Sequence, residues 1–306
     1  MRNEEDRPVD LRRLRRRGII FSAMHLVAIF AVIFGTPVLT TFFIGDWAVV
    51  IVYVIAWVAV GLFCWRRSRA IAGEYQWHID QTVDFERIIG QYIDLTWFDR
   101  DRTFLRAELS SLMPDGGYGH ANEKVRGNNM MAGKWKGLAL RSAFVEYGEE
   151  GYGESYDPEF ALFKGQLTII DAPTGFHGKL LAIRPVGALG PKGGLTKQGV
   201  KHLLSHTGLG GRKLGTDPVP GWEVYADGNA RALFDERPDL VDGLLHASGM
   251  HFMLIEEDHV AFLGDYQFRT DDYSVEPKAV GEDCEQAMWR LVDEGLRAAG
   301  AACGVK

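Results

Sequence analysis

The sequence contains one pair of residues with the spacing of a metal site, His202 and His206. Side chains four positions apart lie on the same face of a helix, so both imidazoles could reach one zinc ion. The zinc-protease motif also requires a glutamate directly after the first histidine as a general base, and Leu203 occupies that position. We therefore expect no metal site at this pair.

Two further segments lack the residues that their chemistry would need. Gly208-Leu-Gly-Gly-Arg-Lys is glycine-rich like a phosphate-binding loop, but it lacks the Gly-Lys-Ser/Thr ending. Cys284 is flanked by Asp283 and Glu285, and neighbouring negative charge disfavours the thiolate that a nucleophile needs. The three cysteines are far apart and form no Cys-x-x-Cys pair, so neither a disulfide nor a structural zinc site is indicated.

Acid–base chemistry is not indicated either. Glu256 and Glu257 are adjacent in an expected hairpin turn, where carboxylates serve solubility. The chain has no Gly-x-Ser-x-Gly motif of the kind that carries a catalytic serine. We predict no catalytic, cofactor-binding or metal-binding residue and no cofactor.

A glycine-rich segment between Arg184 and Lys213 concentrates positive charge. No acidic residue follows until Asp217, and the basic residues are Arg184, Lys192, Lys197, Lys201, Arg212 and Lys213. We predict a loop between strands, with two interpretations open. Either the basic residues keep a solvated insertion soluble, or they contact anionic lipid headgroups or an acidic protein partner.

Composition places these candidates in a folded protein with an uneven charge. Of 306 residues, 46% are hydrophobic and 25% are charged, which excludes a disordered chain. The net charge of -7 argues against a nucleic-acid partner, since nucleic acid requires a basic surface. Residues 1–69 contain ten arginines and five acidic residues, a net charge of +5, so the remainder carries -12. A basic segment joined to an acidic body suits a domain held at an anionic membrane surface.

Two apolar segments free of charged residues, 18–44 and 48–65, predict a transmembrane helical hairpin over residues 18–65. The first contains fifteen Leu, Ile, Val and Phe residues, and each segment approaches the roughly 20 residues that cross a ~30 Å hydrocarbon core. A signal peptide has a shorter apolar region of about 7–15 residues, and here a second span follows almost at once. For His25 inside the first span, a proton relay and a tolerated neutral histidine stay open.

Arginines set the predicted orientation. They flank both outer ends of the hairpin, at Arg12, Arg13, Arg15, Arg16, Arg17, Arg66, Arg67 and Arg69, whereas the connecting turn has only Asp46. Positive flanks stay in the cytoplasm. We predict a multi-pass protein of the bacterial inner membrane with both termini cytoplasmic, including the basic segment 1–17.

The rest of the chain predicts an α+β domain. Apolar residues at three- to four-residue spacing indicate a helical stalk over 70–114, which turn residues from Pro114 end. From about Met131 to Tyr147 the spacing indicates a strand, the first element of a mixed helix and antiparallel-strand domain over 130–272. A C-terminal amphipathic helix is predicted over 280–300.

Turn glycines and strand aromatics carry a family resemblance. The motifs are Gly133-Lys-Trp-Lys-Gly-Leu-Ala-Leu, Phe163-Lys-Gly165, Phe176-His-Gly178-Lys, Asp217-Pro218 and Trp222-Glu-Val-Tyr-Ala-Asp227. Over roughly residues 10–272 the chain resembles an uncharacterised bacterial domain-of-unknown-function family with two N-terminal membrane spans and a cytoplasmic α+β domain. It departs at Val219-Pro220-Gly221-Trp222, where that family usually has an acidic residue and a Phe, and it adds the C-terminal helix. The resemblance implies an architecture and a membrane location, and it carries over no catalytic residue.

We therefore expect a membrane-anchored cytoplasmic protein that works by binding, as a scaffold, sensor or accessory subunit, with the lipid bilayer as a partner. The alternative is a membrane-tethered hydrolase or transferase with an unrecognised active site. A deep pocket with carboxylates and two or more histidines would favour the enzyme, the candidates being His177, His202, His206, His246, His251 and His259. A shallow surface with an apolar or basic patch would favour binding.

Overall fold

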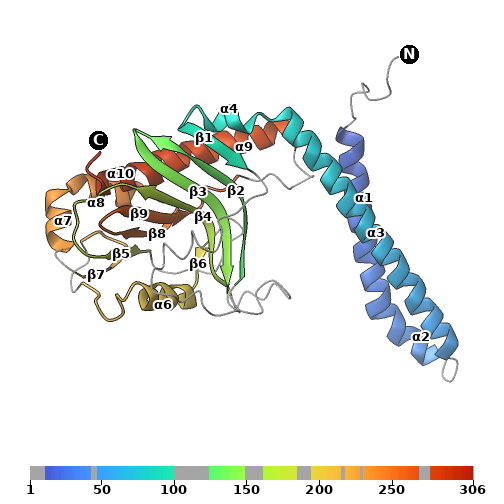
Figure 1. Cartoon of the computed structure of the whole chain (residues 1–306). Coiled ribbons are helices and arrows are strands. Elements are labelled where there is room, and N and C mark those ends of the chain that lie inside the picture. Colours follow the sequence, from blue (N-terminus) through green and yellow to red (C-terminus); the bar gives the residue numbers. More distant parts are fainter. Residues whose placement is uncertain are drawn as a thin grey trace, which may run out of the picture. The chain divides into compact units, whose positions relative to one another are not determined.

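The structure is a computed structural model that describes residues 11–42, 47–99, 124–148, 161–184, 194–214, 218–227, 230–268 and 276–305 (Figure 1). The class is α+β, as predicted, with an antiparallel sheet and with helices of which two are long and apolar. The chain divides into two compact units. The first comprises residues 1–84 and 269–282, and the second comprises residues 85–268 and 283–306.

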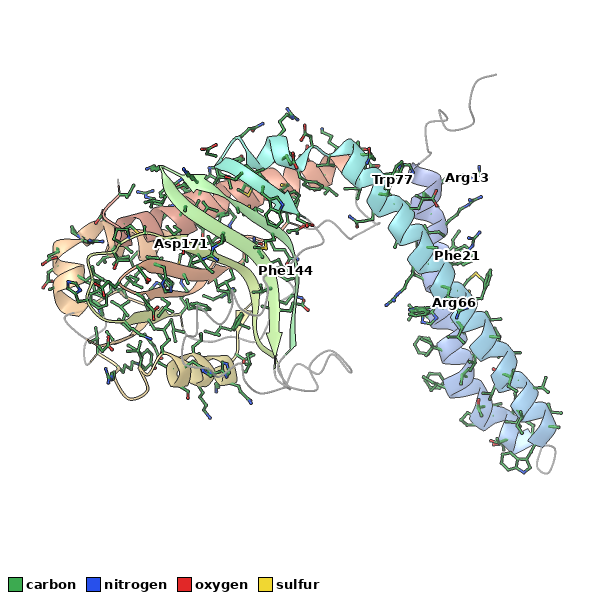
Figure 2. All side chains as sticks on the ribbon, in the orientation of Figure 1. Arg13, Phe21, Arg66, Trp77, Phe144 and Asp171 are labelled. Atoms are coloured by element: carbon green, nitrogen blue, oxygen red, sulfur yellow. The ribbon has the colours of Figure 1, made fainter. Side chains whose placement is uncertain are left out.

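The first unit is built on the two long apolar helices. α1 (Leu11–Phe30) continues through a π-helical turn, η2 (Ala31–Gly35), into α2 (Thr36–Phe42), and α3 covers Trp47–Thr82. Both helices are long and apolar enough to cross a membrane. Their apolar side chains point outward: of 24 large apolar side chains exposed in the described part of the chain, 21 lie between Ile19 and Trp65 (Figure 2).

Three hydrogen bonds join α1 and η2 to α3. They connect Ser22 Oγ with Ser68 Oγ at 2.8 Å, His25 Nδ1 with the Gly61 carbonyl at 3.0 Å, and the Tyr53 hydroxyl with the Ala31 carbonyl at 2.8 Å. Polar groups that bond across an otherwise apolar helix pair select one register of that pair. The histidine inside the first predicted span is thus bonded to the backbone of α3.

The π-turn η2 depends on one close contact. Backbone bonds in a π-turn run from residue i to i+5, which disturbs the regular carbonyl ladder. The Tyr53 hydroxyl donates to Ala31, the first residue of this turn. A Cβ at Gly35 would collide with that hydroxyl, so glycine leaves the space through which the tyrosine reaches the backbone.

The second unit is built on a nine-stranded sheet with the order β1-β2-β3-β4-β9-β8-β5-β7, and β6 pairs with β4. The strands are β1 (Asp94–Asp99), β2 (Lys124–Trp135), β3 (Leu138–Gly148), β4 (Ala161–Asp171), β5 (Leu180–Ile183), β6 (Gly194–Leu195), β7 (Glu223–Ala226), β8 (Met250–Ile255) and β9 (His259–Gly264). The described pairings are all antiparallel.

The helices are α4 (Phe85–Ile89), α6 (Lys197–His206), α7 (Ala230–Glu236), α8 (Pro238–His246), α9 (Pro277–Arg290) and α10 (Arg297–Ala302). A second π-turn, η5 (Leu291–Leu296), joins α9 to α10 without a break. We refer to α9, η5 and α10 together as the C-terminal helix (Figure 1).

Different helices cover the two faces of the sheet. On one face, Leu203 of α6 shares the main hydrophobic core with Leu263 of β9. On the other face, the ring of Phe262 fits against Gly295 in η5. Consecutive strand residues point to opposite faces, so β9 is buried on both sides. This explains why β5, β8 and β9 are nearly continuous apolar runs rather than alternating ones.

The C-terminal helix crosses α8 antiparallel and at close range. A Cβ on Gly243 would lie 2.9 Å from the Cα of Ala298, so the two backbones are almost in contact there. On one side of this crossing the Arg237 side chain donates to the Ala302 carbonyl. On the other side, His246 and Asp293 form an ion pair, and these contacts hold α8 against the helix.

The predicted helical stalk over 70–114 is wrong beyond residue 89. Helix ends at Thr82 and again at Ile89, and Asp94–Asp99 forms β1, which pairs with β2. A six-residue segment can form its backbone hydrogen bonds in a sheet as well as in a helix. Pairing with the distant strand β2 made residues 94–99 a strand. Residues 100–114 of the predicted stalk lie outside the described residues.

The predicted single strand from Met131 to Tyr147 is two strands, β2 and β3. They are joined at Lys136 and Gly137, which both have positive φ angles of 49° and 83°. Two such residues make the tight turn whose twist matches a hairpin. Asn, Asp or Gly is preferred at the first position of such a turn, so the lysine there did not indicate a turn.

Replacing Gly243 with valine tests the helix crossing. The new side chain would meet the backbone of Ala298, and overpacking of this kind costs about 1–3 kcal/mol. We expect a lower thermal midpoint of the second unit, measured on the full chain in detergent by circular dichroism. Gly73→Ala in α3 is the matched control, because a Cβ at Gly73 meets nothing within 4 Å. An unchanged midpoint for Gly243→Val would contradict the crossing.

Candidate functional site

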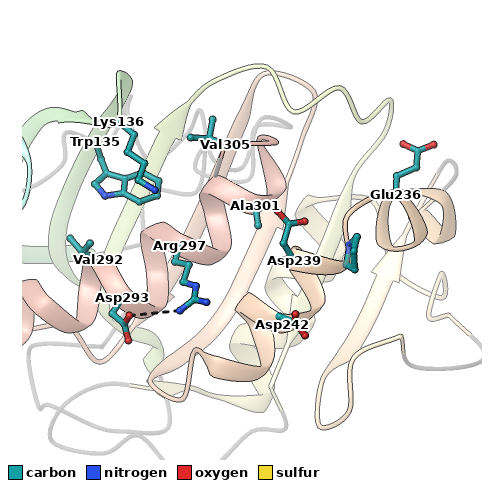
Figure 3. Close-up of a pocket in the computed structure, with 11 residues that line it drawn as sticks. Trp135, Lys136, Glu236, Asp239, Asp242, Val292, Asp293, Arg297, Ala301 and Val305 are labelled. Atoms are coloured by element: carbon teal, nitrogen blue, oxygen red, sulfur yellow. Dashed lines mark ion pairs between the residues drawn. The ribbon is translucent and has the colours of Figure 1, made fainter.

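A cavity of about 710 Å³ opens in the second unit between the β2–β3 turn, α7–α8 and the C-terminal helix (Figure 3). We call it the acidic groove. Its charged residues are Glu236, Asp239, Asp242, Asp293, Lys136 and Arg297, and its apolar lining includes Trp135, Val292, Ala301 and Val305. Four carboxylates therefore face two cations. The volume lies within the range of ordinary ligand sites.

The acidic wall follows from the sequence of α8. Pro238 opens the helix at a position that needs no backbone donor, and Asp239 in the first turn suits the positive end of the helix dipole. Leu240 and Leu244 are buried on the opposite side. This orientation leaves Asp239 and Asp242, three residues apart, exposed toward the groove.

The opposite wall is shaped by the π-turn η5. Asp293 points outward, with its Oδ2 2.8 Å from His246 Nε2 and its Oδ1 3.9 Å from Arg297 Nη1 (Figure 3). Its neighbour Glu294 is buried and accepts bonds from the Gly249 N–H at 2.7 Å and from Arg290 Nε at 3.0 Å. The π-turn thus directs one carboxylate into the groove and the next into the protein.

An indole ring and an ammonium group meet beside the groove. Trp135 is buried, and a Cβ on Gly300 would lie 2.7 Å from its ring, so the indole packs directly on the backbone of α10. Lys136 Nζ lies 4.8 Å from the centre of the Trp135 ring, a cation–π contact. The Lys136 ammonium group therefore already occupies this part of the lining.

The carboxylates of the groove are suited to binding positive charge. The polar lining of the groove consists of carboxylates, the Lys136 ammonium and the Arg297 guanidinium, with no histidine, cysteine or serine among the described residues. Glu236, Asp239 and Asp242 are exposed and form no ion pair with residues that the structure describes. Three unpaired carboxylates on one wall give the groove a local negative potential.

The six basic residues predicted as an anionic-surface contact differ in their surroundings. Arg184 donates to the Ser248 carbonyl at 2.8 Å and covers the Trp222 ring at 5.0 Å. Arg212 pairs with Asp227 at 3.3 Å, and Lys213 pairs with Glu223 at 2.8 Å.

The predicted loop between Arg184 and Lys213 is wrong over part of this segment, because residues 194–195 form β6 and residues 197–206 form α6. Lys197 and Lys201 lie one turn apart and are both exposed on α6, and Lys192 lies outside the described residues. Three of the six charges are therefore engaged within the second unit, and two share an exposed helix face.

The six candidate histidines belong to the second unit. His202 and His206 stack on α6 with ring centres 4.0 Å apart. Burial, and then the proximity of His206, lower the pKa of His202 to about 4. The others each face a carboxylate, in the pairs His177–Glu257, His246–Asp293, His251–Asp265 and His259–Asp258. None of these six histidines lines the acidic groove.

One group among the described residues has the composition of a cation site, Glu256, Asp258 and His259. His259 Nδ1 lies 2.7 Å from Asp258, while its Nε2 lies 3.2 Å from Glu256, so the carboxylates bracket the ring from opposite edges. Lys179 Nζ lies 3.2 Å from the other oxygen of Glu256. An ammonium therefore already neutralises Glu256, and the hydrogen bond from His259 lowers the pKa of Asp258. We interpret the group as a structural charge network.

The surroundings of Cys284 disfavour its thiolate, the direction that its acidic neighbours predicted. Burial raises the pKa of its thiol far above the ordinary range, and the negative charges of Asp283 and Glu285 add to this effect. A buried thiol that stays protonated is a poor nucleophile.

Comparison with protein families, with curated proteins and with solved structures finds no match to this chain. The resemblance to a two-span bacterial family therefore stays a prediction.

Sequence reasoning missed the groove. Its residues Trp135, Asp242 and Asp293 are far apart in the chain and meet only through the crossing of α8 with the C-terminal helix. One signal was present: Asp239 and Asp242 share a helix face with Leu245, which is 47% exposed. An acidic helix face beside an exposed leucine is typical of an interaction surface.

The lowered pKa of His202 predicts a pH-dependent stability. Unfolding restores a pKa near 6.5, so the unfolded chain binds more protons between pH 6.5 and about 4. The stabilising effect of the neutral imidazole is complete above pH 6.5 and decreases as the pH falls toward 4. We expect His202→Gln to flatten the loss of thermal midpoint over this interval, with the exposed His177→Gln as control. Equal pH slopes for the original chain and His202→Gln would contradict this environment.

Proposed function

We propose that this chain is a membrane-anchored binding protein of the bacterial inner membrane, acting as a scaffold, sensor or accessory subunit. In this proposal α1 and α3 cross the bilayer as a hairpin. The second unit lies in the cytoplasm and works by binding a partner at the acidic groove. The observation that carries the binding role is the wall of three carboxylates, Glu236, Asp239 and Asp242, which form no ion pair with residues that the structure describes.

The exposed surface of α1 and α3 supports the membrane part of the proposal. Helices in the core of a soluble protein bury their apolar side chains, whereas the span windows of these two are only 11% and 17% buried. Trp47 and Trp65 are both exposed, and eighteen residues of helix separate them by about 27 Å. That distance is close to the ~30 Å hydrocarbon core between two aromatic belts.

The bonds between the helices support a hairpin. Their partners in α1 and η2 rise in the order Ser22, His25 and Ala31, while those in α3 fall in the order Ser68, Gly61 and Tyr53. This is the order of an antiparallel pair. With arginines beyond both outer ends, such a pair would keep both chain termini in the cytoplasm.

The alternative, a membrane-tethered hydrolase or transferase, has less support. The enzyme alternative predicts a pocket with two or more histidines beside carboxylates. None of the six candidate histidines lines the groove, and among the described residues a single one of them, His246, contacts a carboxylate of the lining, Asp293. The patch that favours binding is acidic, where we had expected an apolar or basic one.

We also propose contact with anionic lipid, through two of the six basic residues that the sequence suggested. Lys197 and Lys201 project from the exposed face of α6, and no acidic residue lies within that helix. Each basic residue near an anionic surface contributes about 1 kcal/mol. We assign this role to the two lysines of α6, because Arg184, Arg212 and Lys213 already have partners within the unit.

Reporter fusions test the topology. A reporter active only in the cytoplasm should be active when fused after Lys306 and silent when placed in the turn after Asp46. A reporter active only outside the cytoplasm should show the reverse, because the arginine-rich flanks are retained inside. Activity of the external reporter after Lys306 would contradict the hairpin and the cytoplasmic location.

Site-specific photocrosslinking in living cells tests the binding role. A photoreactive amino acid at Lys136 places the probe in the groove and keeps its carboxylates, so we expect a discrete protein adduct there. At Lys201 we expect adducts to lipid. The control position is Glu86, exposed on α4 and outside the groove, where no discrete adduct should form. The same adducts at Glu86 as at Lys136, or none at Lys136, would contradict binding at the groove.

A further inference from the structure

Two large apolar side chains of the second unit are exposed to solvent. Among its described residues, the large apolar side chains with high exposure are Leu245 and Trp289, which are 47% and 55% exposed. Exposed tryptophan and leucine are costly to leave in water, and tryptophan is prominent among residues that dominate binding energy at interfaces. We call this pair the apolar shoulder.

The apolar shoulder adjoins one end of the acidic groove. Leu245 lies one turn from Asp242 on α8, and Trp289 lies one turn from Asp293 on the C-terminal helix. The ion pair between His246 and Asp293, at 2.8 Å, joins the two helices at this point. Since α8 and the C-terminal helix run antiparallel, Leu245 and Trp289 both lie at the same end of the crossing, where Gly249 approaches Arg290.

The groove carboxylates are arranged for several positive charges rather than for one metal ion. Coordination requires three or more ligand atoms that converge, and the one described group that meets this condition is Glu256, Asp258 and His259, outside the groove. Glu236, Asp239 and Asp242 are instead spaced along α7 and α8. Spaced carboxylates complement the spaced cations of a polypeptide.

We propose that the acidic groove and the apolar shoulder together bind a protein segment that combines lysine or arginine residues with apolar residues. This inference rests on the proposed binding function and names its partner class. The basic side chains would pair with Asp239, Asp242 and Glu236, and an apolar side chain would cover Trp289 and Leu245. A small amine could occupy the groove, but it would leave the shoulder exposed. The continuity of groove and shoulder therefore favours a segment several residues long.

Peptide binding to the full chain in nanodiscs of uncharged phosphatidylcholine tests this assignment. The probe is a fluorescent peptide of about twelve residues that combines lysines and leucines, followed by fluorescence anisotropy. Two control peptides separate the contributions: one replaces each leucine with serine at the same charge, and the other replaces each lysine with glutamate. We expect the lysine–leucine peptide to bind most tightly and its affinity to fall with rising salt.

Variants of the chain locate the site. Replacing both Asp239 and Asp242 with asparagine should raise the Kd about three- to tenfold. Trp289→Ala should raise it about fivefold or more. The matched control removes the same charge elsewhere, at the exposed Glu86 and Asp94, as Glu86→Gln with Asp94→Asn, and should leave the Kd unchanged. Thermal midpoints of all variants should agree with that of the original chain, which keeps a loss of binding separate from a loss of folding.

Three results would overturn the inference: no binding of the lysine–leucine peptide, equal binding of the serine peptide, or equal weakening by the Glu86 and Asp94 control. If the peptide fails while the photocrosslinked adduct at Lys136 persists, the partner class is wrong and the proposed function stands. If that adduct is also missing, the proposed function fails together with the inference.

Discussion

The close approach of the C-terminal helix to its neighbours is the constraint on which the second unit depends. At three points along it, one partner contributes no side chain: Gly295 against Phe262, Gly300 against Trp135, and Gly243 of α8 against Ala298. The helix can therefore lie on the sheet, on the β2–β3 turn and on α8 at once. Dense packing of this kind leaves little room for adjustment, because a single added methyl group must displace backbone or an aromatic ring.

The acidic groove is a consequence of that packing. Once the C-terminal helix is fixed against α8, Asp293 and Arg297 form one wall, while Asp239 and Asp242 form the other. A buried network secures the same helix from inside. Glu294 is paired with Arg290 at 3.0 Å and with the Gly249 N–H, and the nearby Tyr266 is buried, which raises the pKa of its phenol well above 10. The buried carboxylate of Glu294 is thus paired inside the protein. The carboxylates of α7 and α8 that form no ion pair among the described residues face the groove.

The sequence predicted what depends on local pattern. Uncharged runs predicted two long apolar helices, and helix and strand periods predicted the fold class. The prediction from sequence was wrong where pairing with a distant strand determines the secondary structure. The example is β1, which residues 100–123 separate from its partner strand β2. Leu244 and Leu245 are adjacent leucines of α8, yet Leu244 is buried and Leu245 is exposed, a difference that depends on tertiary packing. The groove could not be predicted because its walls come from three segments that only tertiary packing brings together.

In the binding model that we propose, the second unit binds a basic, apolar segment at the surface formed by α8 and the C-terminal helix. Hydrogen–deuterium exchange of the full chain in uncharged nanodiscs, with and without the lysine–leucine peptide, addresses it most directly. We expect slower exchange in segments covering Pro238–Leu245 and Trp289–Ala302, with no change in α6 or α4. Slower exchange confined to α6, or equal exchange with and without peptide over α8 and the C-terminal helix, would contradict it.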